Sequence, residues 1–185
     1  MNIIVIGHGM VGHKFIESLL DGGAHGVHVT VLCEEPRPAY DRVHLSEFLA
    51  GKTADDLSLV TPGFFDRGDA TLRLNARAVA VDRLARTVML ADGEVLGYDK
   101  LVMATGSYPF VPPLPGKDRK DCFVYRTIED LEAMRECGAR SKTGVVIGGG
   151  LLGLECAKAL RDLGLATHVV EFAPRLMAVQ VDDGG

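Results

Sequence analysis

Two glycine-rich segments have the spacing that binds the phosphates of a dinucleotide. Both read G-x-G-x-x-G, with glycines at Gly7, Gly9 and Gly12 in the first segment and at Gly148, Gly150 and Gly153 in the second. In this pattern the first glycine makes a tight turn and the second lets the backbone approach a pyrophosphate. The third glycine lets the following helix pack against the strand. The phosphates then face free amide N–H groups at the positive end of a helix dipole.

A carboxylate follows each segment at the distance expected for ribose binding. Glu34 lies 22 residues after Gly12, and Glu171 lies 18 residues after Gly153. A carboxylate at this position accepts hydrogen bonds from the hydroxyls of an adenosine ribose. The alternative interpretation is that the two segments are ordinary tight turns and that the acidic residues follow them by chance. Two such sites predict two dinucleotides, and the most economical pair is a flavin and a nicotinamide with hydride passing between them.

Apolar patterning places each glycine segment between a strand and a helix. The first unit has a strand over 2–6, a helix over 10–21 and a strand over 27–33, and the second repeats it over 143–147, 151–163 and 166–172. The second unit begins 141 residues after the first. The chain therefore repeats one architecture, and an α/β fold with Rossmann-like units is expected.

The segments between these units have other patterns. Residues 36–66 contain several prolines and two short helical pieces, around "LSEFLAG" and "ADDLSL". Residues 71–104 read as short alternating strands, which predict a small antiparallel meander returning to a parallel strand. The proline-rich stretch 109–116 marks a boundary, and Thr127 with Asp130 can cap a helix over 128–137.

The composition is that of a globular protein. Of 185 residues, 47% are hydrophobic and 24% are charged, with a net charge of −5. Lysine and arginine form no long run, and no apolar run approaches a membrane span, so neither a nucleic-acid nor a membrane partner is expected. The N-terminus enters a strand at once, without the basic region of a signal peptide, which favours a cytoplasmic location.

The sequence resembles the two-dinucleotide flavoprotein reductases, the glutathione-reductase-like superfamily. The resemblance rests on the two glycine segments and on "DGEVLGYDKLVMATGSYP". Within that superfamily the chain is similar to the N-terminal part of the large subunit of NAD(P)H-dependent nitrite reductases. The segments that carry this similarity are "GHGMVGHKF", "EEPRPAYDRVHLSEFLAGK", "FVYRTIEDLEAM", "GGGLLGLECAKAL" and "APRLMAVQVDD".

The resemblance implies a FAD-binding domain over 1–115 and a partial NAD(P)H-binding domain over 116–185. It implies that FAD lies on Gly7, Gly9, Met10, Val11, Gly12, Glu34, Arg42, Val79, Thr105 and Gly106. It implies that NADH lies on Gly148, Gly150, Leu151, Leu152, Gly153, Glu155 and Glu171, with Glu155 near the nicotinamide end. Electrons then pass to downstream redox centres or a small subunit.

Several residues depart from the family or admit two interpretations. Related reductases carry a lysine after the "L-S" of the 36–66 segment, whereas Glu47 follows Ser46 here. No cysteine lies in 8–26 or 36–66, which argues against the disulfide and persulfide reductases. His8 and His13 are expected to be solvated rather than pyrophosphate donors. Arg175 is an alternative contact for a 2′-phosphate.

The four cysteines predict ordinary reduced thiols. Cys33, Cys122, Cys137 and Cys156 form no C-x-x-C pair or metal-ligand spacing. Cys33 and Cys156 lie in apolar stripes, so we expect them in the core.

The chain has only part of the family's pattern. It lacks the later strands of a nicotinamide domain, the returning Gly-Asp segment of the flavin domain, and the sirohaem and iron–sulfur cysteines. We therefore expect a fragment of a longer protein that alone binds FAD weakly or not at all. Three functions remain open: the diaphorase part of a nitrite reductase, an NADH-dependent ferredoxin- or rubredoxin-type reductase, and a non-catalytic nucleotide-binding fragment.

Overall fold

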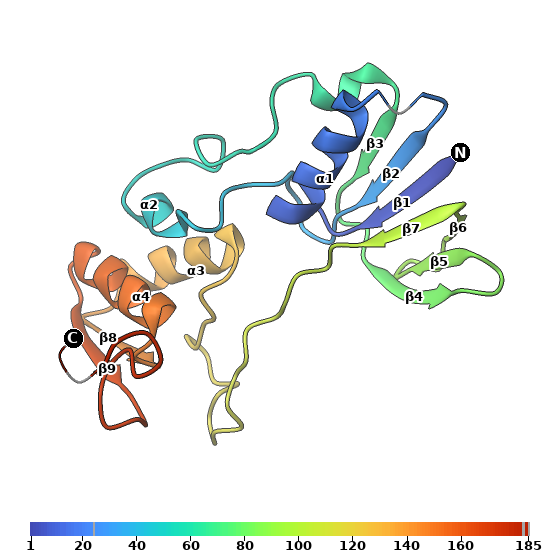
Figure 1. Ribbon diagram of the computed structural model, residues 1–185. Coiled ribbons are helices and arrows are strands. Elements are labelled where there is room, and N and C mark those ends of the chain that lie inside the picture. Colours follow the sequence, from blue (N-terminus) through green and yellow to red (C-terminus); the bar gives the residue numbers. More distant parts are fainter. Residues whose placement is uncertain (24, 183, 185) are drawn as a thin grey trace. The chain divides into compact units, whose positions relative to one another are not determined.

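The computed structural model describes residues 1–23, 25–182 and 184, and it divides into two compact units (Figure 1). One unit comprises Met1–Asp41 and Ser58–Ser107. The other comprises Arg42–Leu57 and Tyr108–Gly185. Each glycine segment thus lies in a different unit. The division of function at residue 115 stays a prediction.

The first unit is built on a four-stranded parallel sheet. Its strand order is β3-β2-β1-β7, formed by β3 (Ala70–Arg73), β2 (His28–Leu32), β1 (Asn2–Ile6) and β7 (Lys100–Met103). Helix α1 (Met10–Asp21) connects β1 to β2 and lies against one face of the sheet (Figure 1). Ile16 and Leu20 of this helix are buried against Val5 and Val29 of the strands. The predicted strand–helix–strand unit is therefore confirmed.

An antiparallel meander supplies residues to the opposite side of the same strands. It consists of β4 (Ala78–Asp82), β5 (Thr87–Leu90) and β6 (Val95–Gly97). Val88 and Leu90 pack in one core cluster with Ile4, Ile6 and Leu32. Both faces of β1 are thus covered, which explains why its sequence is a continuous apolar run rather than an alternating one.

One strand assigned to the meander from the sequence lies elsewhere. Residues 70–73 form β3, which pairs in parallel with β2, with Val29 opposite Ala70 and Leu32 opposite Arg73. The prediction of an antiparallel strand there was wrong. The alternation of apolar and polar residues in a short strand does not specify which strand it pairs with. Ala70 is buried in the core beside α1, which is consistent with a place in the parallel sheet.

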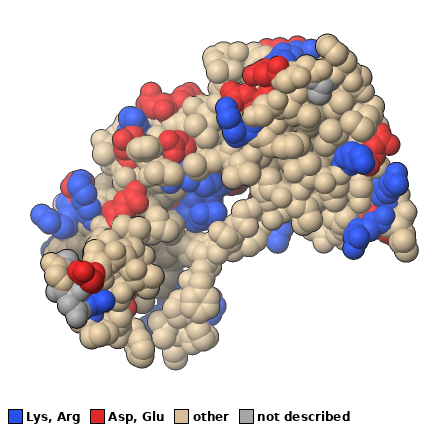
Figure 2. Space-filling view, viewed as in Figure 1, with Lys and Arg blue, Asp and Glu red and all other residues tan. Residues whose placement is uncertain are grey.

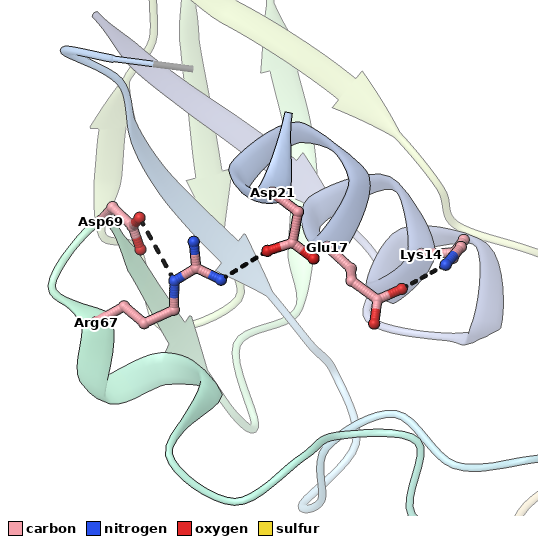
Figure 3. Close-up of polar contacts among 5 residues, drawn as sticks. All are labelled: Lys14, Glu17, Asp21, Arg67 and Asp69. Atoms are coloured by element: carbon pink, nitrogen blue, oxygen red, sulfur yellow. Dashed lines mark hydrogen bonds and ion pairs between the residues drawn. The ribbon is translucent and has the colours of Figure 1, made fainter. Parts of the chain in front are cut away.

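A 3₁₀ turn, η1 (Phe64–Arg67), precedes β3 and packs on α1. Its Arg67 reaches two carboxylates: Nη1 lies 2.9 Å from Asp21 Oδ1 of α1, and Nε lies 3.7 Å from Asp69 Oδ2 (Figure 3). Figure 3 also shows the exposed Lys14–Glu17 pair on α1. Such surface pairs contribute little. We therefore attribute the position of η1 to Phe64, which is buried in the core.

The second unit repeats the strand–helix–strand arrangement. Strands β8 (Thr143–Ile147) and β9 (Ala166–Val170) are parallel and are joined by α4 (Leu151–Asp162). Helices α2 (Leu45–Leu49) and α3 (Ile128–Gly138) complete the unit. Its core contains Met134, Val146, Cys156 and Leu160. The predicted elements at 143–147 and 151–163 are confirmed, and β9 ends earlier than predicted.

The predicted helical piece at "ADDLSL" does not form. Residues 54–57 make turns instead. The Asp56 carboxylate accepts hydrogen bonds from the amide and the hydroxyl of Thr53, at 2.8 and 2.7 Å. Aspartate and threonine favour such local bonds over helix interiors, which explains the wrong prediction.

Charged side chains of both signs lie on the surface. Figure 2 shows lysine and arginine interspersed with aspartate and glutamate on the face that it displays. Among the described residues, no helix combines the length and the apolar character needed to cross a bilayer.

Candidate dinucleotide-binding sites

The first glycine loop joins β1 to α1, and at two of its positions the backbone leaves no room for a Cβ atom. Gly7 has a φ of +105°, and a Cβ on it would overlap the carbonyl oxygen of Ala104. A Cβ on Gly12 would overlap the carbonyl oxygen of Gly7. By contrast, a Cβ on Gly9 would meet nothing within 4 Å. The loop therefore closes on itself at Gly7 and Gly12 and opens outward at Gly9.

The second glycine loop joins β8 to α4 and repeats most of these features. Gly148 has a φ of +116°, and a Cβ on Gly153 would overlap the carbonyl oxygen of Gly148. A Cβ on Gly150 would meet nothing within 4 Å. The loops differ at the first glycine, because a Cβ on Gly148 would meet nothing within 4 Å, whereas one on Gly7 would overlap Ala104. Both loops share an overlap at the third glycine and open space at the central glycine, where a pyrophosphate can approach the backbone.

The helices that follow the loops begin in a way that suits an anion. Helices α1 and α4 begin after Gly9 and Gly150, which have no side chain to cap the first amides. Helix α3 differs, because Thr127 and Asp130 form a complete capping box at its start, as predicted. The first amides of a helix have no intrahelical partner and carry partial positive charge. The starts of α1 and α4 therefore fit the phosphates of a dinucleotide.

Glu171 lies directly after β9 and is fixed at the second loop. Its Oε2 accepts the amide N–H of Gly149 at 2.6 Å, and its Oε1 accepts the amide N–H of Ala173 at 2.6 Å. The hydrogen bonds from Ala173 and Gly149 lower the pKa of this carboxyl group below its usual value. Glu171 is therefore an ionised carboxylate held in place beside the loop. The sequence predicted its position but not this link to Gly149.

Glu34 occupies the corresponding position in the first unit, two residues after β2. Its carboxylate is exposed, and Oε2 lies 3.7 Å from Nε of Arg77. At this distance the pair is a loose surface ion pair. The carboxylate is thus accessible to a ligand at the end of the strand.

The remaining residues assigned to FAD from the resemblance are distributed over both units. Thr105 and Gly106 follow β7, and the amide nitrogen of Thr105 is 3.1 Å from a Cβ built on Gly7, so these residues adjoin the loop. Val79 lies in β4 and is 51% exposed. Arg42 belongs to the second unit, where its guanidinium donates to the carbonyl oxygen of Arg126 at 3.2 Å.

Four of the residues assigned from the resemblance are exposed at the helix starts. Met10 and Val11 of α1 and Leu151 and Leu152 of α4 are all exposed large apolar side chains. Each pair lies directly after the open glycine of its loop. These side chains are therefore accessible next to the place where a dinucleotide is expected.

Glu155 of α4 has a partner that the sequence did not indicate. The hydroxyl of Tyr125 donates to Glu155 Oε1 at 3.3 Å. Burial raises the pKa of the Tyr125 hydroxyl, and Glu155 raises it further, so the hydroxyl remains a donor. Burial, with a contribution from Glu155, raises the pKa of the neighbouring Cys156 thiol to about 11. This thiol is therefore protonated at neutral pH and a poor nucleophile.

The expectation of solvated histidines at the first loop was wrong. His8 and His13 are 4% and 5% exposed. Their rings pack on each other, and Phe65 and Phe64 contact them with ring centroids 5.4 and 5.1 Å away. These phenylalanines come from η1, more than fifty positions away in sequence, so local sequence patterns gave no signal of the burial.

Comparison with known proteins identifies the family. Residues 1–184 match pyridine nucleotide-disulphide oxidoreductases. The chain belongs to this family. Membership of the pyridine nucleotide-disulphide oxidoreductase family implies binding of FAD and NAD(P)H, and the two glycine loops fit two dinucleotides.

Curated relatives of this chain include subunits of a nitrite reductase and of an assimilatory nitrate reductase. The chain is 54% identical to the nitrite reductase (NADH) large subunit of Escherichia coli (strain K12), covering 100% of this chain and 22% of that protein. It is 35% identical to the assimilatory nitrate reductase electron transfer subunit of Bacillus subtilis (strain 168), covering 97% of this chain and 24% of that protein. The chain thus spans less than a quarter of the length of these curated relatives.

A solved structure of a ferredoxin reductase has the same fold. The ferredoxin reductase for the CYP199A2 system from Rhodopseudomonas palustris superposes with a TM-score of 0.90 at 32% sequence identity. The match covers 99% of this chain and 45% of that chain. The predicted fold, a Rossmann-like FAD-binding unit with a small antiparallel meander followed by the start of a second Rossmann-like unit, is confirmed.

Proposed function

We propose that this chain is the diaphorase part of a nitrite reductase large subunit, in which NADH reduces FAD. The observation that carries the proposal is the pair of glycine loops, each with an open central glycine, an uncapped helix start and a carboxylate after the next strand. The 54% identity to a nitrite reductase large subunit supports the choice among flavoprotein reductases.

The first loop is assigned to FAD. Its amides and the start of α1 hold the pyrophosphate, and Glu34 accepts hydrogen bonds from the ribose. The full set is Gly7, Gly9, Met10, Val11, Gly12, Glu34, Arg42, Val79, Thr105 and Gly106, taken from the resemblance. Residues 1–115 form the flavin domain in this proposal.

The second loop is assigned to NADH. Its amides and the start of α4 hold the pyrophosphate, Glu171 holds the adenosine ribose, and Glu155 lies near the nicotinamide end. The full set is Gly148, Gly150, Leu151, Leu152, Gly153, Glu155 and Glu171. Residues 116–185 form part of the NAD(P)H domain in this proposal.

The two cofactors together supply hydride transfer followed by transfer of electrons. The chain's own residues bind and orient the two dinucleotides. The electrons leave for iron–sulfur and sirohaem centres of the longer protein, or for a small subunit, and nitrite is the final acceptor.

A second candidate function is an NADH-dependent reductase of a ferredoxin or rubredoxin. The similarity in fold to a ferredoxin reductase favours it. The two functions share the NADH and FAD sites and differ in the acceptor. Two assays of the intact protein separate these functions, one with nitrite as the electron acceptor and one with an oxidised ferredoxin or rubredoxin as the acceptor.

Replacement of Glu34 tests the flavin site. We expect Glu34→Ala to weaken FAD binding about ten- to hundredfold, because it removes a charge-assisted hydrogen bond to the ribose. The measurement is a titration of the intact apo-protein with FAD. Arg77→Gln is the matched control, because it removes the neighbour of Glu34 and leaves the carboxylate. Unchanged affinity in Glu34→Ala removes this residue from the site.

Replacement of the cysteines tests the route of the electrons. Cys33 and Cys156 are buried, Cys122 is exposed, and all four cysteines are unbridged thiols. We expect a variant with all four replaced by serine or alanine to keep most of its NADH–ferricyanide activity, because no thiol takes part. Of the four substitutions, only those at the buried Cys33 and Cys156 are expected to lower the stability of the protein. Loss of turnover in a folded Cys122→Ser variant contradicts this route.

A further inference from the structure

The buried imidazole of His8 connects the first glycine loop to a segment distant in sequence. His8 is the residue between Gly7 and Gly9, and its Nδ1 accepts the amide N–H of Ala39 at 3.1 Å. Both residues belong to the first unit and are buried, with Ala39 1% exposed. A buried amide that loses its acceptor is costly. The hydrogen bond is therefore a firm link between the loop and residue 39.

The protonation state of His8 suits this link. Burial, together with the nearby His13, lowers the pKa of His8 to about 4, so the ring is neutral at pH 7. Because Nδ1 accepts a hydrogen bond, the proton of the neutral ring is on Nε2. Nε2 of His8 and Nδ1 of His13 are buried without a hydrogen-bond partner among the described residues. Unpaired polar atoms in a core are unfavourable, so packing alone would be better served by an apolar side chain.

The segment around Ala39 is compact and begins at Glu34. The Tyr40 hydroxyl donates to Glu35 Oε2 at 2.8 Å, and the Cys33 thiol donates to the carbonyl oxygen of Arg37 at 3.5 Å. The carbonyl oxygen of Ala39 accepts the amide of Leu59 at 3.0 Å. These bonds fold residues 33–40 into a compact turn. Backbone hydrogen bonds of Cys33 and Glu35 hold the start of this turn to residues 73–76, and Ala39 is the point at which its end is attached to the glycine loop.

We propose that His8 is a positioning residue for FAD. By accepting the Ala39 amide, it fixes residues 34–40, and with them the Glu34 carboxylate, against the loop that holds the pyrophosphate. This role rests on the proposed binding of FAD at the first loop. His8 acts through the backbone of Ala39 and through the turn, and its own ring does not contact the cofactor.

Two amide side chains distinguish this role from simple packing. In His8→Asn, Oδ1 stands the same number of bonds from Cα as Nδ1 of histidine, so it can accept the Ala39 amide. In His8→Gln the amide group is one bond further out, at the place of Nε2, and Ala39 loses its acceptor. His8→Leu fills the volume without any acceptor. His25→Asn, at an exposed histidine, is the control for a surface change.

The experiment measures FAD affinity of the intact apo-protein and hydrogen exchange of the Ala39 amide. We expect His8→Gln and His8→Leu to bind FAD about tenfold more weakly and to exchange the Ala39 amide faster. We expect His8→Asn and His25→Asn to bind FAD with an affinity within about threefold of that of the unaltered protein. We expect their Ala39 amides to remain protected from exchange.

Three results would overturn the proposal, and they are distinguishable. Equal FAD affinity in all His8 variants removes the role of His8 while leaving the flavin site intact. Weak binding in folded His8→Asn, with its Ala39 amide still protected, assigns the effect to ring packing against Phe65 and His13. Failure of the unaltered protein to bind FAD overturns the proposed function itself, and with it this role.

Discussion

Gly12→Ala is expected to destabilise the intact protein, whereas Gly9→Ala is expected to spare its stability and prevent tight FAD binding. A methyl group on Gly12 would overlap the carbonyl oxygen of Gly7, so the start of α1 must move. We expect this overpacking to lower the free energy of unfolding by about 1–3 kcal/mol or more, because backbone cannot yield as a side chain does.

Gly9 differs because the bound dinucleotide, and not the protein itself, is expected to exclude a side chain at this position. Its φ of −92° is accessible to alanine, and a Cβ there meets nothing within 4 Å. We expect the free energy of unfolding to change by less than about 0.5 kcal/mol. The methyl group would stand where the pyrophosphate approaches the amides, so FAD affinity should fall by about a hundredfold or more.

Urea unfolding and FAD titration of both variants test this contrast. The second loop offers the same pair, because Gly153 has an overlapping carbonyl and Gly150 has open space. Gly150→Ala is expected to affect NADH and not FAD. A Gly9→Ala variant that binds FAD as tightly as the unaltered protein would show that the pyrophosphate lies elsewhere.

Coenzyme choice is the second large effect, and we expect the intact protein to use NADH better than NADPH by at least about tenfold in kcat/KM. The Glu171 carboxylate is fixed by the amides of Gly149 and Ala173 and is ionised at neutral pH. A carboxylate in this position accepts from a ribose diol and repels a 2′-phosphate.

Two variants separate the contributions of charge and loop geometry. Glu171→Gln removes the charge and is expected to raise NADPH use relative to NADH, with less effect on NADH itself than Glu171→Ala. Arg175→Ala is the control, because Arg175 is the exposed cation that would otherwise bind a 2′-phosphate. Equal use of both coenzymes by the unaltered protein contradicts the assignment of Glu171 and favours Arg175.

Local patterns predicted most of the fold. The strands at 2–6 and 143–147 and the helix over 10–21 follow from short-range apolar periodicity, and the cap at Thr127 follows from two side chains three positions apart. These features depend on neighbours in sequence. The placement of β3 depends on pairing with β2, and an alternating strand of four residues does not specify its partner.

The same limit explains what the sequence missed at the candidate sites. The burial of His8 requires Phe65, the hydrogen bond to Glu155 requires Tyr125, and the link from Glu171 reaches back to Gly149. Each contact joins residues at least 22 positions apart. The glycine loops themselves were predictable, because their conformation favours glycine at the first and third positions of a fixed spacing.

The transfer of hydride from NADH to FAD is the central claim, and one anaerobic mixing experiment tests it most directly. The intact protein is purified, its FAD content per chain is determined, and it is mixed with NADH while the visible flavin absorption is followed. We expect one FAD per chain and loss of the flavin band at least as fast as steady-state turnover. A protein that lacks FAD, or whose bound FAD stays oxidised in excess NADH, contradicts the account.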